Sequence, residues 1–127
     1  MIAEAKLLQK IEEDLDELVQ IAENCITATN AADENSGLEE SQLRNLQNLA
    51  AATDSVLALE NFISYQMGRK KIPDPVGQQI LKDIEQLGKK AEELAGGNPE
   101  ALRWARMELI RLYLGFLVRK FVAERKR

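Results

Sequence analysis

The stretch that decides the fold is NPEALRWARMELIRLYLGFLVRKFVAE, residues 98–124. Asn98 followed by Pro99 is typical of a helix start, with the asparagine as cap and the proline as first helical residue. Beyond it, apolar side chains recur at steps of three and four, the spacing of one helix face. That face comprises Leu102, Ala105, Leu109, Leu112, Tyr113, Phe116 and Leu117. The sequence predicts a long amphipathic helix over 99–124, with Gly115 placed where another helix can approach closely.

A second helix is predicted over 75–95, immediately before this stretch. Asp74 is suited to cap it and Pro75 to be its first residue, while Gly96 and Gly97 end it. Its inward residues are Ile80, Ile84, Leu87, Ala91 and Leu94.

Residues 38–68 predict one long helix or a kinked pair. Ser36-Gly37-Leu38-Glu39 has the form of a capping box, which favours a start at about Leu38. Thr53-Asp54-Ser55 can cap a new helix, so we expect a kink or short break there. Gly68 is a natural C-cap, and residues 69–74 then form a basic loop.

The N-terminal residues predict a single acidic helix over 3–29, followed by a polar loop over 30–37. Its apolar stripe contains Leu8, Ile11, Leu15, Leu18, Ala22 and Cys25. Cys25 is therefore expected to be a small core residue. Because nothing in the chain predicts a strand, we expect an all-α fold, an antiparallel bundle of four to five helices in a single domain spanning 1–127.

The composition excludes many functions for this chain of 127 residues. It has no histidine and one cysteine, so zinc fingers, His-based triads, di-iron sites and disulfide frameworks all lack their atoms. We therefore expect no enzymatic activity, no metal and no cofactor. A lone thiol favours a cytoplasmic location. No apolar run approaches the roughly 20 residues of a membrane span, and the N-terminus has no pattern of a secretory signal, so no membrane contact is expected.

The net charge of −4 conceals two opposed regions. Residues 1–40 carry eleven acids and two bases, whereas residues 41–127 carry fifteen bases and ten acids. The helix dipole favours acids at a helix start and bases at its end, and it accounts for Arg125. It does not account for Arg103, Arg106 and Arg111, which lie in the first half of the final helix.

These three arginines fall within about 140° of one another around the helix, off the apolar stripe. They predict a basic ridge that binds phosphates without reading sequence, and Arg119 and Lys120 extend it. With only six aromatic residues in the chain, we expect contact with nucleic acid to be mainly to phosphates.

Three short motifs resemble the all-helical small subunits of CRISPR–Cas effector complexes. They are Ser41-Gln42-Leu43-Arg44-Asn45 at a helix start, Tyr65-Gln66-Met67-Gly68-Arg69 at a helix end, and Leu109-Ile110-Arg111-Leu112-Tyr113-Leu114-Gly115-Phe116 in the final helix. The resemblance covers roughly 41–121. It is greatest to the subunits of type III and type I-D complexes, where a similar module forms the C-terminal part of the large subunit.

The resemblance implies a non-catalytic brace, present in several copies stacked head to tail along the inner face of the effector complex. Its implied partners are the backbone and large subunits, further copies of itself, the guide RNA–target duplex and, in DNA-targeting types, the displaced strand. Arg44 and Arg69 lie inside the motifs, and Lys70 and Lys71 adjoin them. The acidic N-terminal helix has no counterpart in the motifs and suggests a surface for a basic neighbour.

Three other interpretations remain open. In the first, the chain is an adaptor or assembly factor that contacts proteins only. In the second, it is an enzyme that uses carboxylates and lysines alone. In the third, it is a peripheral membrane protein bound through the basic tail of residues 119–127.

Overall fold

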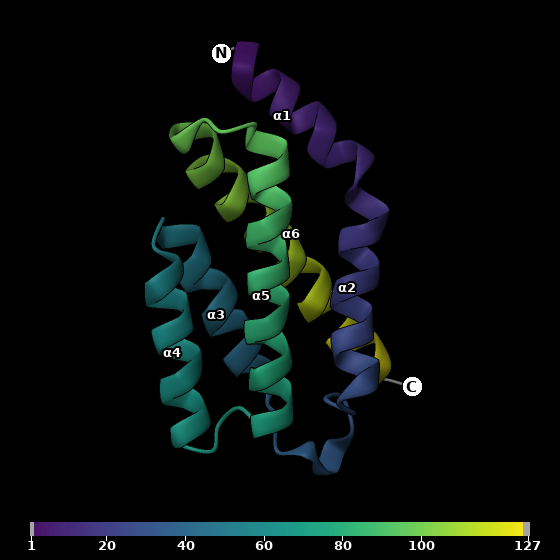
Figure 1. Cartoon of the computed structure of the whole chain (residues 1–127). Coiled ribbons are helices and arrows are strands. Elements are labelled where there is room, and N and C mark those ends of the chain that lie inside the picture. The colour runs from purple at the N-terminus through teal and green to yellow at the C-terminus, as the bar shows by residue number, and fades with distance from the viewer. Residues whose placement is uncertain (1, 126–127) are drawn as a thin grey trace.

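Six α-helices make up the computed structural model, which describes the backbone of residues 2–125 and the side chains of residues 4–125 (Figure 1). They are α1 (Ile2–Glu13), α2 (Leu15–Ala28), α3 (Glu40–Ala52), α4 (Val56–Gly68), α5 (Asp74–Ala95) and α6 (Pro99–Arg125), with a short 3₁₀ turn η1 (Glu34–Ser36) before α3. No strand occurs in this part of the chain. The predicted all-α fold is confirmed, but the number of helices is six rather than four to five.

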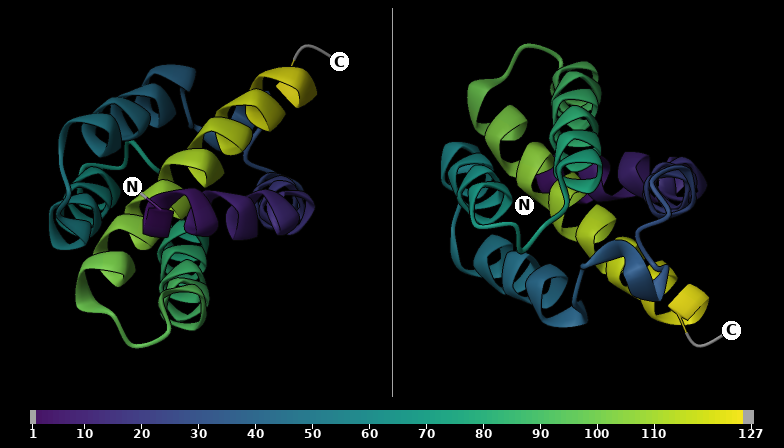
Figure 2. Two further views of the ribbon diagram at one scale, coloured as in Figure 1. Left: turned by 90° about the horizontal axis from the view of Figure 1, so that it is seen from above. Right: turned by 90° about the horizontal axis from the view of Figure 1, so that it is seen from below.

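From α2 onward, successive helices run in opposite directions (Figure 1). The helices α2, α5 and α4 lie roughly side by side, with α5 in the middle, and α6 crosses them obliquely (Figures 1 and 2). Helix α1 turns away from α2 and passes over α6 at one end of the molecule (Figure 2). The acidic helix α2 therefore lies on the opposite side of α5 from α4 (Figure 1).

Helix α6 is the axis of the core, because α2, α3 and α5 all pack against it. Its buried residues are Ala105, Met107, Leu109, Ile110, Tyr113, Leu114, Leu117, Val118 and Phe121. This set is wider than the predicted stripe, since Ile110, Leu114 and Phe121 are fully buried. Of the predicted face, Leu102, Leu112 and Phe116 are only partly buried. Helices on several sides of α6 bury more than one apolar face.

The single helix predicted over 3–29 is wrong, because the chain bends at Asp14 between α1 and α2. Asp14 donates its backbone N–H to Ile11 O at 3.0 Å, which closes a tight turn. The Lys90 ammonium of α5 reaches the carboxylates of Glu17 at 2.7 Å and Asp14 at 3.6 Å. The bend rotates α1, so Leu7 is buried while the predicted core residue Leu8 is 51% exposed.

Several helix ends are confirmed. The Asn98 side chain accepts hydrogen bonds from the N–H groups of Glu100 and Ala101, as a cap before Pro99 should. Gly96 ends α5 in the left-handed conformation. The expected break at residues 53–55 separates α3 from α4, where Ser55 accepts from Ala58 N–H.

Three other predicted caps are wrong. Ser36 bonds to Ala31 O and Leu38 N–H within the loop, so α3 begins at Glu40 without a capping box. Gly68 is the last residue of α4, and Lys70 takes the left-handed conformation, with φ of 61°. Asp74 is the first residue of α5 rather than its cap.

A buried polar cluster joins α2, α5 and α6. The Tyr113 hydroxyl donates to Asp83 Oδ2 at 2.6 Å, and the Gln79 amide donates to Asp83 Oδ1 at 2.9 Å. Cys25 contacts both Asp83 and Tyr113, and burial raises the pKa of its thiol to about 12. Burial also raises the pKa of Asp83 and outweighs the two donors, which favour its ionised form. Cys25 is confirmed as a core residue.

No helix within residues 2–125 is both long enough and apolar enough to cross a membrane.

The raised pKa of Asp83 gives a pH dependence with a defined sign. The folded state holds the Asp83 proton more tightly than the unfolded state, so stability falls as the pH rises from the unfolded value near 3.8 through the folded pKa. Asp83→Asn removes this titration. We expect the free energy of unfolding of the variant, minus that of the wild type, to increase over this interval and then level off. Urea unfolding followed by circular dichroism at several pH values measures it, and a constant difference would contradict the assignment.

Candidate nucleic-acid interface

The structure divides the nine cations predicted to bind nucleic acid among separate places. Arg69, Lys70 and Lys71 form a turn after α4. Arg44 of α3 and Arg119 of α6 line one groove, and Arg103 and Arg106 of α6 line a second hollow. Arg111 points into the α3–α4 junction, and Lys120 pairs with Glu124 one helical turn away at 2.7 Å.

The turn of Arg69, Lys70 and Lys71, here called the basic turn, is exposed but firmly held. Lys71 and Ile72 both donate backbone N–H groups to Gln66 O, at 2.9 and 3.2 Å, and Ile72 is fully buried. The Arg69 guanidinium lies 5.3 Å from the centre of the Tyr65 ring. Among the described residues, no carboxylate forms an ion pair with any of the three. The basic turn therefore presents three uncompensated cations on a fixed backbone.

A groove of about 430 Å³ runs between α3 and α6. Arg44 and Arg119 line it above an apolar floor that includes Val118 and Val122. Arg44 pairs with Glu40 one turn away, and Arg119 lies over the Phe116 ring at 5.7 Å. Both arginines are exposed. An exposed ion pair such as Arg44–Glu40 contributes little to stability, so both guanidiniums can turn to a ligand.

Gly115 lines the same groove and does not serve the close helix approach predicted for it. A methyl group at this position would meet only the Gln47 amide, at an ordinary contact distance of 3.8 Å.

The hollow around Arg103 and Arg106 lies between α4, α5 and α6 and has mixed charge. Four acids and three bases line it, namely Asp54, Glu60, Glu85 and Glu92 with Lys89, Arg103 and Arg106. Arg106 is half-buried, and its Nε is buried without a hydrogen bond. This surface is less suited to a phosphate chain than the basic turn, because acids line it as densely as bases.

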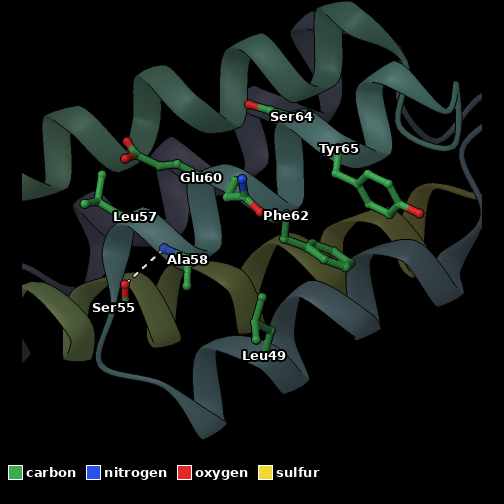
Figure 3. Close-up of a pocket in the computed structure, with 9 residues that line it drawn as sticks. Leu49, Ser55, Leu57, Ala58, Glu60, Phe62, Ser64 and Tyr65 are labelled. Carbon is green, nitrogen blue, oxygen red and sulfur yellow. Dashed lines mark hydrogen bonds between the residues drawn. The ribbon is translucent and has the colours of Figure 1, made fainter.

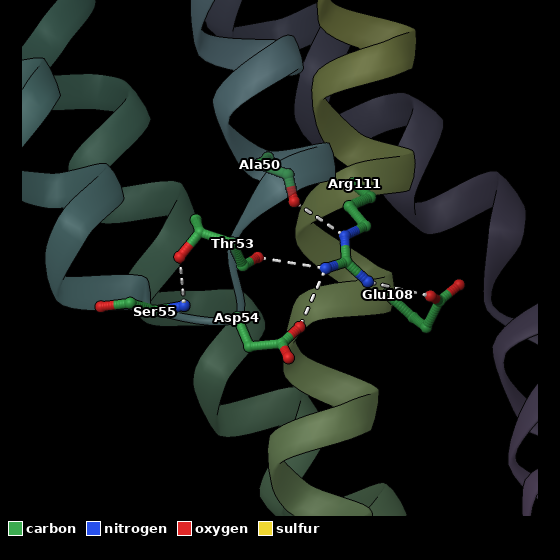
Figure 4. Close-up of polar contacts among 6 residues, drawn as sticks. All are labelled: Ala50, Thr53, Asp54, Ser55, Glu108 and Arg111. Carbon is green, nitrogen blue, oxygen red and sulfur yellow. Dashed lines mark hydrogen bonds and ion pairs between the residues drawn. The ribbon is translucent and has the colours of Figure 1, made fainter.

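The Arg111 guanidinium forms its hydrogen bonds within the protein, at the end of α3 (Figure 4). Its Nε donates to Ala50 O at 2.9 Å, and its Nη2 donates to Thr53 O and to Asp54 Oδ1, both at 3.1 Å. These carbonyls belong to the end of α3, where backbone acceptors have no partner within the helix. Arg103, Arg106 and Arg111 therefore do not line one exposed ridge.

Arg103 and Arg106 do not converge with the basic turn either. Arg103 and Arg106 share their hollow with Ser55 and Val56 at the start of α4, whereas the basic turn follows its end. The length of α4 separates them, about 20 Å for 13 residues.

Sequence patterns did not identify three features that the structure makes evident. Tyr65 is 59% exposed beside the basic turn, whereas the motif that contains it predicted a binding role only for Arg69. Asp83 stands among the inward residues Ile80, Ile84 and Leu87, and an acid on an apolar stripe was the available signal for the buried cluster. Arg125 donates to Ala32 O, Asp33 O and Leu38 O, and nothing local predicts that contact.

No group of three or more Cys, Asp or Glu side chains within the described part of the chain is arranged to hold a metal ion. Comparisons of the chain with protein-family models, with curated proteins and with solved structures find no match. The functional assignment therefore depends on the surfaces described above and on the short motifs of the sequence.

The internal role of Arg111 predicts a difference between two arginines of the same helix. Arg111→Met keeps the aliphatic stem but leaves the carbonyls of Ala50 and Thr53 without their donor, which should lower the free energy of unfolding by about 1–3 kcal/mol. Arg103→Met, at an exposed position, should change it by less than about 0.5 kcal/mol. Urea unfolding of both variants measures this, and equal effects would contradict the internal role.

Proposed function

We propose that this chain is a non-catalytic, nucleic-acid-binding subunit, of the kind that forms the small subunit of CRISPR RNA-guided effector complexes. The observation that carries the proposal is the basic turn, in which Arg69, Lys70 and Lys71 are exposed and without an acidic partner among the described residues. Arg44 lies in one of the three motifs that resemble this family, and Arg69 lies in another. The all-helical fold is compatible with it.

In this proposal the cations bind phosphates and leave sequence recognition to the guide RNA. Arg69, Lys70 and Lys71 form charge-assisted hydrogen bonds to phosphate oxygens, and Arg44 and Arg119 add contacts along the α3–α6 groove. Strand exchange between guide and target is nearly balanced in energy, so a few contacts from each copy favour the bound state. Arg111 is assigned to the fold and has no part in this interface.

The acidic helices α1 and α2 have a different role in the proposal. Glu12, Glu13 and Asp16 of these two helices are exposed. Because this face repels phosphates, it is assigned to a basic protein neighbour in the assembly. With a pI near 5.0, the isolated chain binds nucleic acid weakly, and the assembly supplies most of the affinity.

The experiment that tests the proposal is mild-salt purification of the tagged chain from its native cells, with identification of the proteins and RNA that elute with it. We expect a repeated backbone protein and short RNAs that share a repeat sequence. A nuclease-treated sample is the control. Elution alone, or with proteins but no nucleic acid, would contradict the proposal and favour an adaptor.

The basic turn can be tested separately in the assembled complex. Replacing Arg69, Lys70 and Lys71 by alanine should weaken target binding evenly across target sequences, because phosphate contacts carry no sequence information. The slope of log K against log salt should become shallower by about one for each phosphate that the variant no longer binds. A matched variant with Lys6, Lys10 and Lys82 replaced by alanine removes three exposed cations elsewhere and should leave the slope unchanged. Equal slopes in both variants would remove the basic turn from the interface.

A further inference from the structure

An exposed stripe runs along α4 into the basic turn. Leu57, Asn61, Tyr65 and Arg69 follow one another at intervals of four residues, and all four are exposed. Residues four apart lie on the same side of a helix, so the stripe is continuous. From Leu57 to Arg69 it extends about 18 Å, the length of about five stacked nucleotides.

The stripe is unusually apolar for an exposed helix face. Three large apolar side chains are exposed among the described residues, and two of them, Leu57 at 78% and Tyr65 at 59%, lie on it. Beside it is a shallow hollow between α3 and α4 (Figure 3). Phe62 and Leu49 approach each other there, while the Tyr65 ring projects away from the helix (Figure 3). An apolar hollow beside a projecting aromatic ring suits a flat, partly polar ligand.

The polar and charged groups of this region indicate which class of ligand fits the hollow. Asn61 and Ser64 line the hollow and offer hydrogen bonds, and the Arg69 guanidinium lies 5.3 Å from the centre of the Tyr65 ring. The three cations of the basic turn follow at one end. Glu60 is the one carboxylate among the lining residues, and it lies nearer the other end of α4. Charge thus favours an anionic chain that enters from the basic turn.

We propose that the α4 stripe is a stacking site for unpaired nucleobases, with a base against the Tyr65 ring and the adjoining phosphates on Arg69, Lys70 and Lys71. This rests on the proposed function and makes its ligand more specific, because stacked bases of a duplex cannot reach the ring. Stacking on an aromatic side chain tolerates any base, since every base has a π-face. An unpaired strand crossing α4 therefore needs no sequence recognition by the protein.

The test compares two oligonucleotides of equal charge, six-residue oligothymidylate and a six-residue abasic strand with the same phosphates. Each is titrated to about 1 mM, above the usual range of non-specific dissociation constants, into the ¹⁵N-labelled protein. We expect both to shift the amide signals of the basic turn, and oligothymidylate alone to shift those of Leu57, Asn61 and Tyr65. Oligothymidylate should also bind more tightly, by at least about 5-fold.

Variants separate stacking from charge. Tyr65→Ala should bring the affinities for the two strands to within about 2-fold of each other, while Tyr65→Phe should keep the preference for bases. Leu8→Ala, at the other exposed apolar position, should change neither affinity. Equal affinities of the wild type for both strands would overturn the stacking site and leave the phosphate contacts intact. Absence of shifts on α4 with either strand would overturn it too, whereas the proposed function is decided by the RNA that elutes with the chain.

Discussion

Burial of α6 on several sides is the constraint on which the rest of the structure depends. No single partner helix can cover buried residues as widely spread around α6 as Leu109, Leu114 and Val118, so α2, α3 and α5 all pack on it. Two arginines of α6 then fix the neighbouring segments. Arg111 holds the end of α3, and Arg125, lying 4.4 Å over the Phe121 ring, holds the loop around residues 32–38. The buried Asp83–Tyr113 hydrogen bond ties α5 to the same helix.

This arrangement decides which charges are available to a partner. Arg111 and Arg125 of the central helix donate to backbone carbonyls and are part of the fold, whereas Arg103 and Arg119 of the same helix are exposed. At the end of α4 the carbonyls of Tyr65, Gln66 and Met67 already accept backbone N–H groups of residues 69–72, and the cations of the basic turn remain exposed. The acidic helix α2 lies across α5 from α4, so α2 and the basic turn are on different sides of α5 (Figure 1). A chain with a net negative charge thereby keeps a compact positive surface.

Local signals in the sequence predicted the helices well and their environment poorly. Proline, glycine and asparagine located both ends of the 75–95 segment and the start of α6 to within a residue, because those residues act on the adjacent backbone. The bend at Asp14 was not predicted because no glycine or proline marks it, and the Lys90 ammonium that contacts Asp14 is remote in the sequence. For the same reason the periodicity of α6 placed Arg111 off the apolar stripe, but it could not reveal that α3 ends beside it.

The candidate site was predictable only in part. The clustering of Arg69, Lys70 and Lys71 is visible in the sequence, whereas the exposure of Tyr65 beside them follows from how α4 packs on α3 and α5. Tyr113, the other tyrosine, is fully buried, and residue type alone does not distinguish the two.

Amide hydrogen exchange across the isolated chain tests the role of α6 most directly. If α6 is the axis of the fold, the amides of residues 109–118 should exchange only through global unfolding, with the slowest rates in the protein. Those of α1, which packs at one end, should exchange much faster. Exchange of residues 109–118 at the rate of α1 would show that the helices around α6 do not depend on it, and would contradict the internal assignment of Arg111 and Tyr113.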